Sequence, residues 1–372
     1  MSARKLRVLL VFGGRSAEHE VSVVSARSVL EALDPARYEV VAVGIDKDGG
    51  WHLLPGPPAL PEGVTGELPA VAPGAGSDVS LDRVPSTREL VSSSGDRESV
   101  DVVFPLVHGP FGEDGTLQGL FEMAGIPYVG AGVTGSALGM DKALQKTLFT
   151  TAGLPVVPHE VVPEREWRED PEAVTARAES MGMPLFVKPA ALGSSVGITK
   201  VKTPADLEPA MEDALRYGRK ALIEQAAEGV REIECAVLGN DDPVASVPGE
   251  IIPTAEFYDY RAKYLDESTR LIVPADLSPE ITEEVQRMAV AAFRAIDAEG
   301  MARVDFFFRQ PDELIVNEIN TIPGFTTVSM YPRLWEASGV SYPELVDRLI
   351  GLALERRELE AKRGNVLPPS RA

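Results

Sequence analysis

The sequence has few of the residues that build disulfides or soft-metal sites. Among its 372 residues there are one cysteine, Cys235, and four histidines. A single thiol cannot close an intrachain disulfide or form a multi-thiolate zinc site, and the histidines have no metal-ligand spacing. These absences exclude a disulfide-stapled fold and favour a reducing compartment, the cytoplasm.

Basic residues and long apolar runs are also scarce. The chain has 36 Lys+Arg against 57 Asp+Glu, a formal net charge of −21. Nucleic acids and anionic membranes are therefore disfavoured as partners, because their phosphates attract basic surfaces. No apolar run approaches ~18 residues, so no bilayer span is predicted. The first run, Leu6–Phe12, is short and lacks a small-residue cleavage site, so we interpret it as a buried strand rather than a signal peptide.

What the sequence does contain is typical of a globular α/β protein with two or three domains. Hydrophobic residues make up 44% and charged residues 25%, and the length allows domains of roughly 100–200 residues. Leu6–Phe12, a glycine turn, a helix over 20–33 and a strand over 38–45 form the βαβ pattern of a parallel sheet. Residues 54–95, rich in proline and glycine, are expected to form an insertion or irregular arm, with at most one short strand near 78–81.

Two further units are expected after the N-terminal one. The predicted domains are 1–126, which holds the parallel sheet, 127–220 and 221–372. Their segments after residue 100 are strand 102–107, helix 116–124, helix 139–155, two strands around a glycine–serine loop in 185–201, the segments 221–225 and 231–239, an aromatic and charged stretch over 254–270, helix 279–299 and a hairpin over 303–320. Ligands are expected at the carboxyl edge of the parallel sheet.

The segment RVDFFFRQPDELIVNEIN at 303–320 is the most informative part of the chain. It has strand character on both sides of a QPDE tetrapeptide, which suits a tight turn. A turn centred in the middle of that tetrapeptide makes Asp305 face Glu318 and Arg303 face Asn320. The period of two also puts each strand's pair on one face. A one-residue bulge would shift the pairing without scattering the oxygen donors.

Asp305, Glu318 and Asn320 are the hard oxygen ligands that suit Mg²⁺ holding the phosphates of a nucleotide. Two unscreened carboxylates that face each other would repel, so a cation explains their pairing. The alternative is a solvent-facing ladder in which Arg303 neutralises Asp305. The glycine-containing, apolar TIPGFTT that follows favours the metal site.

Two lysines are candidate phosphate contacts. Lys188 precedes the loop Gly193–Gly197, whose backbone N–H groups and serine hydroxyls can approach phosphate oxygens. This is not a Walker loop, because the GxxxxGK[ST] order is absent and a strand follows. An ordinary hairpin turn is the alternative. Lys142 is the second candidate, or else a solvated helix lysine.

Two other segments carry alternatives that the residues alone leave open. In GGRSAEHEVS at 13–22, Ser16 can cap a helix with Glu18 in its first turn, or Glu18 can hold an ammonium group at the ligand edge of the sheet. The segment 254–270, with three tyrosines and Lys263, is either a surface loop or a lid that closes over an active site.

Together these motifs resemble the ATP-grasp superfamily, and within it the D-alanine–D-alanine ligase family. The resemblance spans nearly the whole chain, in the family's order, through GGRSAEHEVS, HGPFGEDGTLQG, GMDK, KPAALGSSVG, EFYDYRAKY, RVDFF and NEINTIPGFTTVSMYP. It implies an α/β fold of three domains in the ATP-grasp architecture, with an N-terminal parallel-sheet domain. It also implies that ATP lies between the central and C-terminal domains, and that the N-terminal domain and the 254–270 lid close the amino-acid site.

The resemblance also assigns roles to residues at matching positions. Metal ligands for two Mg²⁺, or Mn²⁺, fall on Asp305, Glu318 and Asn320. The ATP contacts fall on Lys142, Lys188, Ser194, Ser195 and Lys263 for the phosphates, and on Glu224, Ala226, Ala227 and Glu232 for the adenine and ribose. Substrate contacts fall on Glu18, His108, Ser329 and Met330, and the catalytic set on Glu18, Ser194, Tyr264, Arg303 and the Gly324 backbone.

The activity that the resemblance implies is ATP-dependent joining of two D-alanines through a D-alanyl phosphate. It would supply peptidoglycan precursors in the cytoplasm and be carried out by a homodimer. Tyr264 matches members that form dipeptides rather than depsipeptides. The alternatives are D-serine or D-lactate as the acceptor, another ATP-grasp carboxylate–amine ligase, and a nucleotide-binding protein without activity.

Overall fold

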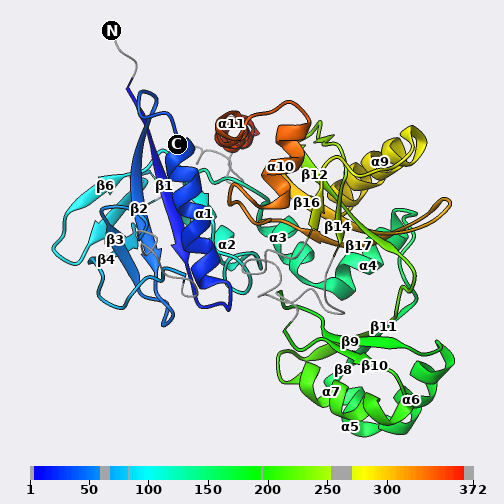
Figure 1. The fold of residues 1–372 in the computed structure, drawn as a ribbon. Helices are drawn as coiled ribbons and strands as arrows, with labels where there is room; N and C mark the ends of the chain where they lie inside the picture. Colours follow the sequence, from blue (N-terminus) through cyan, green and yellow to red (C-terminus); the bar gives the residue numbers. More distant parts are fainter. Residues whose placement is uncertain are drawn as a thin grey trace, which may run out of the picture.

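Three β-sheets organise the part of the chain that the computed structural model describes, residues 4–58, 68–82, 84, 86–193, 196–252 and 270–363 (Figure 1). In chain order the sheets contain seven, four and six strands. Within those residues, no helix has both the length and the apolar composition needed to cross a bilayer. The mixture of parallel and antiparallel strands with helices agrees with the predicted α/β class.

The N-terminal sheet is built around three parallel strands, β1 (Leu6–Gly13), β2 (Tyr38–Ile45) and β7 (Val102–Pro105). The side chains of Val8–Phe12 are fully buried, as expected for a parallel strand covered on both faces. Helix α1 (His19–Ala32) is the crossover between β1 and β2. The predicted βαβ unit is confirmed, and the loops after β1 and β7 leave the same carboxyl edge of the sheet.

The sheet continues beyond β2 with four strands, in the order β6-β5-β4-β3-β2-β1-β7. They are β3 (Trp51–Leu54), β4 (Ser77–Leu81), β5 (Glu89–Ser92) and β6 (Arg97–Ser99), each antiparallel to its neighbours. The short strand expected near 78–81 is β4. The prediction of an irregular arm over 54–95 is otherwise wrong for 77–92, which extends the sheet. These strands are short and largely accessible to solvent, so backbone pairing holds them and no apolar alternation marks them in the sequence.

The central sheet has four antiparallel strands in the order β10-β9-β11-β8. They are β8 (His159–Pro163), β9 (Leu185–Pro189), β10 (Thr199–Val201) and β11 (Lys220–Gln225). One face is covered by helices α5 (Glu164–Glu169), α6 (Pro171–Ser180) and α7 (Leu207–Leu215), the last preceded by a 3₁₀ turn at Pro204–Asp206 (Figure 1). Residues 221–225, which were expected to open the third domain, therefore pair within the central sheet. The domain limits themselves stay a prediction.

The C-terminal sheet is antiparallel, in the order β15-β14-β12-β16-β17, with β13 paired to β12. Its strands are β12 (Arg231–Gly239), β13 (Val244–Ala245), β14 (Gly249–Ile252), β15 (Arg270–Ile272), β16 (Gly300–Arg309) and β17 (Glu313–Asn320), and the helices that pack on it include α9 (Pro279–Ala295), α10 (Met330–Ala337) and α11 (Tyr342–Lys362). Cys235 and Val237 pack with α9, whereas Ala236 and Leu238 pack with α10 and α11. This alternation buries Cys235 fully, which raises the pKa of its thiol to about 12.

Helix α4 attaches the middle of the chain to the edge of this sheet. The helices that follow β7 are α2 (Thr116–Ala124), α3 (Val133–Met140) and α4 (Lys142–Thr151). On α4, the Gln145 amide donates to the Ile319 carbonyl (3.1 Å) and accepts from the Ile319 N–H (3.2 Å). It thus pairs with β17 as a neighbouring strand would, and the Lys146 ammonium donates to the Asn317 carbonyl (3.3 Å). The free edge of β17 is thereby covered.

The hairpin of β16 and β17 has the predicted register at the end that carries the polar side chains. Asp305 pairs with Glu318 and Arg303 with Asn320. Nearer the turn the pairing is shifted by one residue, and a β-bulge just after Asp305 takes up the difference. The predicted pairing is confirmed, although the turn is not centred where it was expected.

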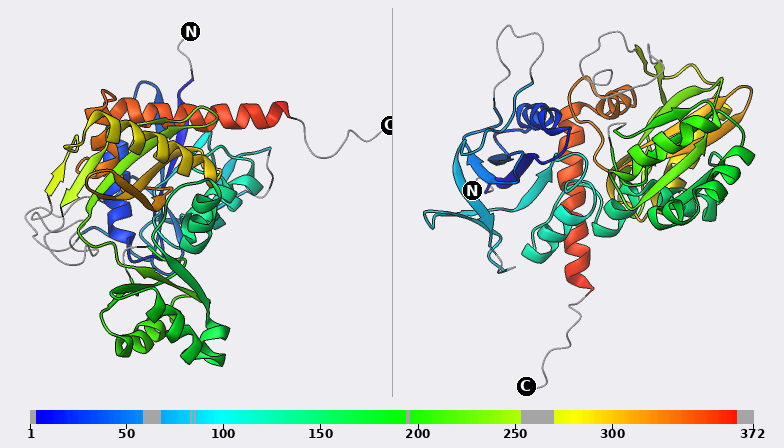
Figure 2. Two further views of the ribbon diagram at one scale, coloured as in Figure 1. Left: turned by 90° about the vertical axis from the view of Figure 1, so that its right-hand side faces the viewer. Right: turned by 90° about the horizontal axis from the view of Figure 1, so that it is seen from below.

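Helix α11 runs between the N-terminal and C-terminal sheets (Figure 2). Its buried side chains share one hydrophobic cluster with residues of β1 and β12. The buried Arg356 guanidinium donates to the carbonyls of Gly130 (2.7 Å) and Tyr128 (2.8 Å) and lies 4.3 Å from the centre of the Tyr128 ring. A Cβ on Gly300 would lie 3.0 Å from the Cα of Gly130, so the two backbones touch at this point. Arg356 therefore ties α11 to the end of the N-terminal region, which in turn touches the start of β16 through Gly130.

We expect Arg356→Met to lower the free energy of unfolding by about 3 kcal/mol, because two buried carbonyls lose a charged donor. Urea denaturation followed by circular dichroism measures the change. The matched control is Arg357→Met, whose guanidinium is partly exposed and pairs with Glu360 at 3.3 Å; it should change stability by less than about 0.5 kcal/mol. Equal effects of the two variants would contradict the role of Arg356.

Candidate active site

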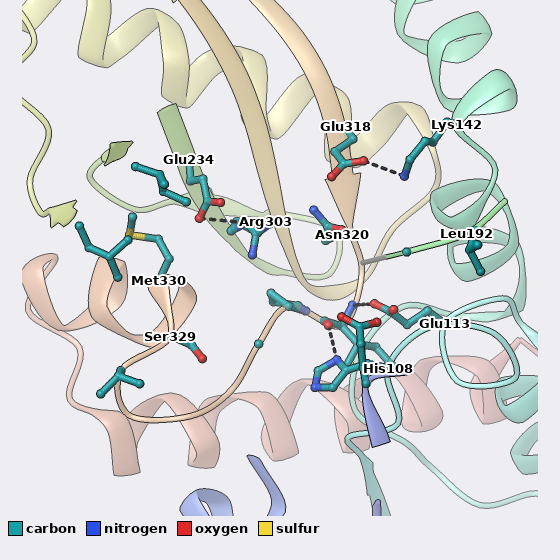
Figure 3. Close-up of a pocket in the computed structure, with 18 of the residues that line it drawn as sticks. His108, Glu113, Lys142, Leu192, Glu234, Arg303, Glu318, Asn320, Ser329 and Met330 are labelled. Carbon is teal, nitrogen blue, oxygen red and sulfur yellow. Dashed lines mark hydrogen bonds and ion pairs between the residues drawn. The ribbon is translucent and has the colours of Figure 1, made fainter. Parts of the chain in front are cut away.

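A cavity of about 140 Å³ lies where all three sheets contribute loops or strands (Figure 3). Its polar lining comes from the N-terminal loops, from the start of α4 and from the C-terminal sheet and the loop after it. The predicted residues that line it are Glu18, His108, Lys142, Arg303, Glu318, Asn320, Gly324, Ser329 and Met330. Glu113 and Glu234 line it as well and were not predicted. The cavity therefore brings together most of the predicted substrate, metal and catalytic positions.

Three neighbouring strands place a row of carboxylates along one side of the cavity. Glu234 on β12 pairs in register with Asp305 on β16, and Asp305 with Glu318 on β17. Arg303 and Asn320 face each other in the next row that points the same way. The exposed fractions of the Asp305 and Glu318 side chains are only 15% and 23%. Like charges at this depth require cations nearby.

Two basic side chains supply that charge. The Arg303 guanidinium donates to both oxygens of Asp305, at 2.7 and 2.8 Å, and its Nε lies 3.1 Å from Glu234 Oε2. The Lys142 ammonium lies 2.7 Å from Glu318 Oε2 (Figure 3). The pairing of Arg303 with Asp305, which was the alternative to a metal site, is thus present. The other half of that alternative is wrong: Glu234 and Glu318 line a cavity and Asp305 between them is only 15% exposed, so the row is not a solvent-facing ladder.

The donor set fits a hard divalent cation. Asp305, Glu318 and Asn320 offer only oxygen ligands on adjacent strands, the choice that Mg²⁺ or Mn²⁺ prefers. Residues that the structure describes contain no group of three or more His, Cys, Asp or Glu side chains able to hold a metal ion. The predicted set, two carboxylates and one amide, stays a prediction, and it leaves coordination positions that oxygens of a phosphate could fill.

Lys142 is positioned by the start of α4. Asp141 is the N-cap residue, and its carboxylate accepts from the N–H groups of Ala143 (3.1 Å) and Leu144 (3.2 Å). Burial by itself lowers the pKa of Lys142, but nearby carboxylates, Glu318 foremost, outweigh burial and leave the pKa above its usual value. The alternative of a solvated helix lysine is wrong, and Lys142 carries its charge into the cavity. Asp141 also makes α4 shorter than the helix predicted over 139–155.

Glu18 lies at the carboxyl edge of the N-terminal sheet. It is the N-cap residue of α1, without a side-chain capping bond, and its N–H donates to the Ser16 hydroxyl (3.2 Å). The alternative in which Ser16 caps the helix is therefore wrong. Glu18 Oε2 lies 3.4 Å from where a Cβ would stand on Gly109 and on Gly193. Its carboxylate thus sits between an N-terminal loop and the central loop, which favours the ligand role over the capping role.

His108 and Glu113 reach across from the N-terminal sheet to the loop after β17 (Figure 3). The Nδ1 of His108 donates to the Ile322 carbonyl (3.0 Å), so Nε2 of the same ring carries no proton when the imidazole is neutral. Burial lowers the pKa of His108, although Glu18 opposes it. The buried Nε2 has no hydrogen-bond partner among the described residues. It is available as an acceptor for a substrate N–H.

Glu113 was missed at the sequence level, although it lies in HGPFGEDG directly after a strand that ends at the ligand edge. It accepts from the N–H of Gly109 (2.6 Å) and from the N–H of Ile322 (3.2 Å). Burial, and then the charge of Glu18, raise the pKa of Glu113 to about 8. Its position in that motif was the available signal.

The predicted nucleotide contacts divide into two groups. Lys142 lines the cavity, whereas Lys188 and Glu224 form a buried cluster beside it with Lys146. Glu224 Oε2 lies 2.5 Å from Lys188 Nζ, and Glu224 Oε1 lies 2.9 Å from Lys146 Nζ. Burial raises the pKa of Glu224, but the two lysines outweigh it and lower the pKa to about 2. Burial lowers the pKa of Lys146, which the sequence analysis did not single out.

Asp305 lies between Glu234 and Glu318 in the row of carboxylates but is not itself part of the cavity lining. The remaining predicted positions do not line the cavity either. Ala226 and Ala227 follow β11 and Glu232 lies on β12, and all three are half-buried. The predictions for Ser194, Ser195, Lys263, Tyr264 and most of the 254–270 lid fall outside the described residues.

This architecture, with two antiparallel sheets beside a cavity of lysines and hard oxygen ligands, is that of an ATP-grasp enzyme. Family models match as "D-ala D-ala ligase N-terminus" over residues 7–131 and as "D-ala D-ala ligase C-terminus" over residues 148–351. The chain belongs to the D-alanine–D-alanine ligase family. The predicted fold class and the resemblance are both confirmed.

This chain is similar to several D-alanine ligases along nearly their whole length. The D-alanine–D-alanine ligase of Streptomyces coelicolor is 52% identical over 94% of this chain and 93% of the relative. That of Geobacillus thermodenitrificans is 48% identical over 95% and 97%. The solved structure of the Coxiella burnetii D-alanine–D-alanine ligase superposes with a TM-score of 0.85 at 40% identity, covering 97% of each chain. The VanG D-Ala:D-Ser ligase of Enterococcus faecalis gives 0.81 at 34%, covering 94% of this chain and 100% of that one.

Glu224→Gln tests the buried cluster through the dependence of stability on pH. Because the pKa of Glu224 is lower in the folded protein, its ionised carboxylate stabilises the fold. This contribution to the free energy of unfolding is complete above the unfolded pKa near 4.5 and is lost as the pH falls toward about 2. Urea unfolding over this pH range should show a shallower loss of stability in the variant, and lower stability at pH 7, because Lys146 keeps a buried charge with one partner fewer. The exposed Glu228→Gln is the control. Identical pH profiles for the two variants would contradict the assignment.

Proposed function

We propose that this protein joins two D-alanines into D-alanyl-D-alanine at the expense of ATP, as the names of its relatives describe for them. One observation carries the proposal. A single cavity is lined by a carboxylate at the sheet edge, Glu18, by a charged Lys142 beside Glu318, and by both Arg303 and Gly324. Ammonium binding, phosphate binding and oxyanion stabilisation are the three tasks that such a ligation needs.

The triphosphate of ATP is proposed to lie against Lys142, with Asp305, Glu318 and Asn320 holding Mg²⁺ or Mn²⁺. A bound divalent ion supplies positive charge that lowers the repulsion between the phosphates and an attacking carboxylate. Two of these proposed metal ligands already have basic partners: Arg303 pairs with Asp305, and Lys142 pairs with Glu318. Both basic groups are therefore placed to shift toward phosphate or substrate oxygens. The resemblance adds Lys188, Ser194, Ser195 and Lys263 on the phosphates, and Glu224, Ala226, Ala227 and Glu232 on the nucleoside.

The first step is attack of the first D-alanine's carboxylate on the γ-phosphate, which gives D-alanyl phosphate and ADP. Glu18 would hold the ammonium group of that D-alanine, and the unprotonated Nε2 of His108 could accept from it. Lys142 would stabilise the charge that moves onto the departing ADP. Because acyl phosphates hydrolyse in water, closure of the cavity by the 254–270 lid and Tyr264 is part of the proposal.

The second step is attack of the second D-alanine's amine on the acyl phosphate, followed by loss of phosphate. The tetrahedral oxyanion would meet the Arg303 guanidinium and the Gly324 N–H, both at the cavity wall. Ser329 is the N-cap of α10, and Met330 is its first residue. The N-terminus of that helix favours an anion, which supports the binding of the second D-alanine's carboxylate there.

The acceptor is the point at which relatives differ, since one solved neighbour is described as a D-Ala:D-Ser ligase. The decisive assay supplies ATP, D-alanine and either D-serine or D-lactate at neutral pH, and identifies products by mass spectrometry. We expect D-alanyl-D-alanine as the main product in every mixture. A main product that is an ester or contains serine would overturn the acceptor assignment, and no D-alanine-dependent release of ADP would overturn the ligase function.

Two further features are proposed from the resemblance, a homodimer and a cytoplasmic location. Leu120 and Met123 on α2 and Val133 on α3 are exposed apolar side chains, which is compatible with a partner surface. Sedimentation velocity distinguishes a dimer from a monomer.

Glu318→Gln should abolish ATP turnover while the protein stays folded. The change removes a charge from the proposed metal site and from the partner of Lys142, and a loss of about 10²-fold or more in the rate of phosphate release is expected. Glu313→Gln, at the exposed start of the same strand and paired with Arg309 at 2.5 Å, is the matched control and should keep its activity. Near wild-type turnover by folded Glu318→Gln would refute the metal assignment.

A further inference from the structure

Glu113 lines the cavity, yet none of the roles above uses it. Its two carboxylate oxygens are both engaged by backbone N–H groups, one in its own loop and one in the loop that follows β17. We propose that Glu113 is a positioning residue: together with His108 it holds the loop 321–329 so that the Gly324 N–H and Ser329 face the reacting groups. The proposal deepens the proposed function and rests on it.

Glu113 and His108 hydrogen-bond both backbone polar groups of Ile322. Glu113 Oε1 accepts from the Ile322 N–H at 3.2 Å, and His108 Nδ1 donates to the Ile322 carbonyl at 3.0 Å. Two hydrogen bonds of opposite sense fix the peptide planes before and after Ile322 in direction as well as in place. Both side chains, the acceptor Glu113 and the donor His108, come from the N-terminal loop after β7, more than 200 residues away in sequence.

The orientation of Ile322 passes directly to Gly324. Pro323 lies between them, and its ring fixes φ near −65°. The residue before a proline is also restricted, so Ile322 has few conformations of its own. One of the two dihedral angles between the Ile322 carbonyl and the Gly324 N–H is therefore fixed, so the orientation of the Ile322 peptide restricts the directions that the Gly324 N–H can take.

The other flank of Gly324 is held independently. The buried Phe325 ring lies 5.7 Å from the ring of Phe104 on β7 and 5.7 Å from that of Tyr342, whose hydroxyl donates to the Phe325 carbonyl at 2.6 Å. Gly324 is partly exposed, whereas Pro323 and Phe325 on either side of it are buried. Its backbone is thus the point where a loop clamped at both ends opens to the cavity.

Glu113 is itself fixed from the N-terminal side. Gly109, at φ +73°, donates its N–H to Glu113 Oε2 at 2.6 Å, and the Gln118 amide donates to the Gly112 carbonyl at 2.7 Å. The carboxylate therefore cannot follow the loop if the loop moves. The arrangement makes the second half-reaction, which uses Gly324 and Ser329, dependent on the N-terminal sheet.

The test is Glu113→Gln, with steady-state kinetics for ATP and for both D-alanine sites. The glutamine keeps the size of the side chain but turns one acceptor into an N–H₂ donor that faces another N–H. We expect kcat to fall about tenfold or more and KM for the acceptor D-alanine to rise severalfold, as misplaced oxyanion donors cause. KM for ATP, and the affinity for a non-hydrolysable ATP analogue, should stay within about twofold.

Glu122→Gln is the matched control, since it makes the same chemical change in the same region, at an exposed carboxylate bonded to the Tyr128 hydroxyl (2.8 Å). It should behave as the wild type. Wild-type kcat and acceptor KM in Glu113→Gln would overturn the proposal. A uniform loss of acceptor binding, nucleotide binding and thermal stability would also overturn it, because that is the result of a merely structural role.

Glu113→Asp replaces Glu113→Gln if the latter does not accumulate as folded protein. It keeps two acceptor oxygens on a chain one methylene shorter, so the same split between acceptor and ATP parameters is expected, to a smaller extent. The proposal can fail while the proposed function stands, when wild-type enzyme makes D-alanyl-D-alanine and the variants match it. If the wild type makes no dipeptide, the proposed function fails first.

Discussion

The register of three neighbouring strands, β12, β16 and β17, is the constraint on which the site depends. It sets Glu234, Asp305 and Glu318 in one row, where only nearby cations can offset their repulsion. A slip of one residue would turn the row toward α9 and put apolar side chains in the cavity. The bulge after Asp305 and the Gln145 amide on the open edge of β17 both hold the register.

Several of the few basic side chains of this acidic protein gather at the site. Three of its ten lysines, at 142, 146 and 188, gather around Glu318 and Glu224, and Arg303 lies between Glu234 and Asp305. Such paired charges are costly to bury and are usually kept for a purpose. In a protein of net charge −21, four basic side chains thus lie in or beside one cavity, and each is paired with a carboxylate.

The site also depends on contact between parts of the chain that are distant in sequence. Glu18, His108 and Glu113 come from loops at the carboxyl edge of a parallel sheet, where such folds commonly bind ligands. The carboxylate row comes from an antiparallel sheet, and α11 packs against both. Arg356 and the pair Gly130 and Gly300 show how closely the two regions approach. A rearrangement of either sheet would therefore move side chains that line the same cavity.

The sequence by itself determined the βαβ unit, the pairing of Asp305 with Glu318 and the family, because these depend on periodicity, a local turn and the order of motifs. It did not predict β5 and β6, whose pairing uses the backbone and leaves no apolar pattern. It also missed Glu113, Glu234 and Lys146. Only the tertiary structure decided that Glu113 meets Ile322 and that Lys146 and Lys188 share Glu224, because burial and charge partners arise between segments that the chain brings together only when it folds.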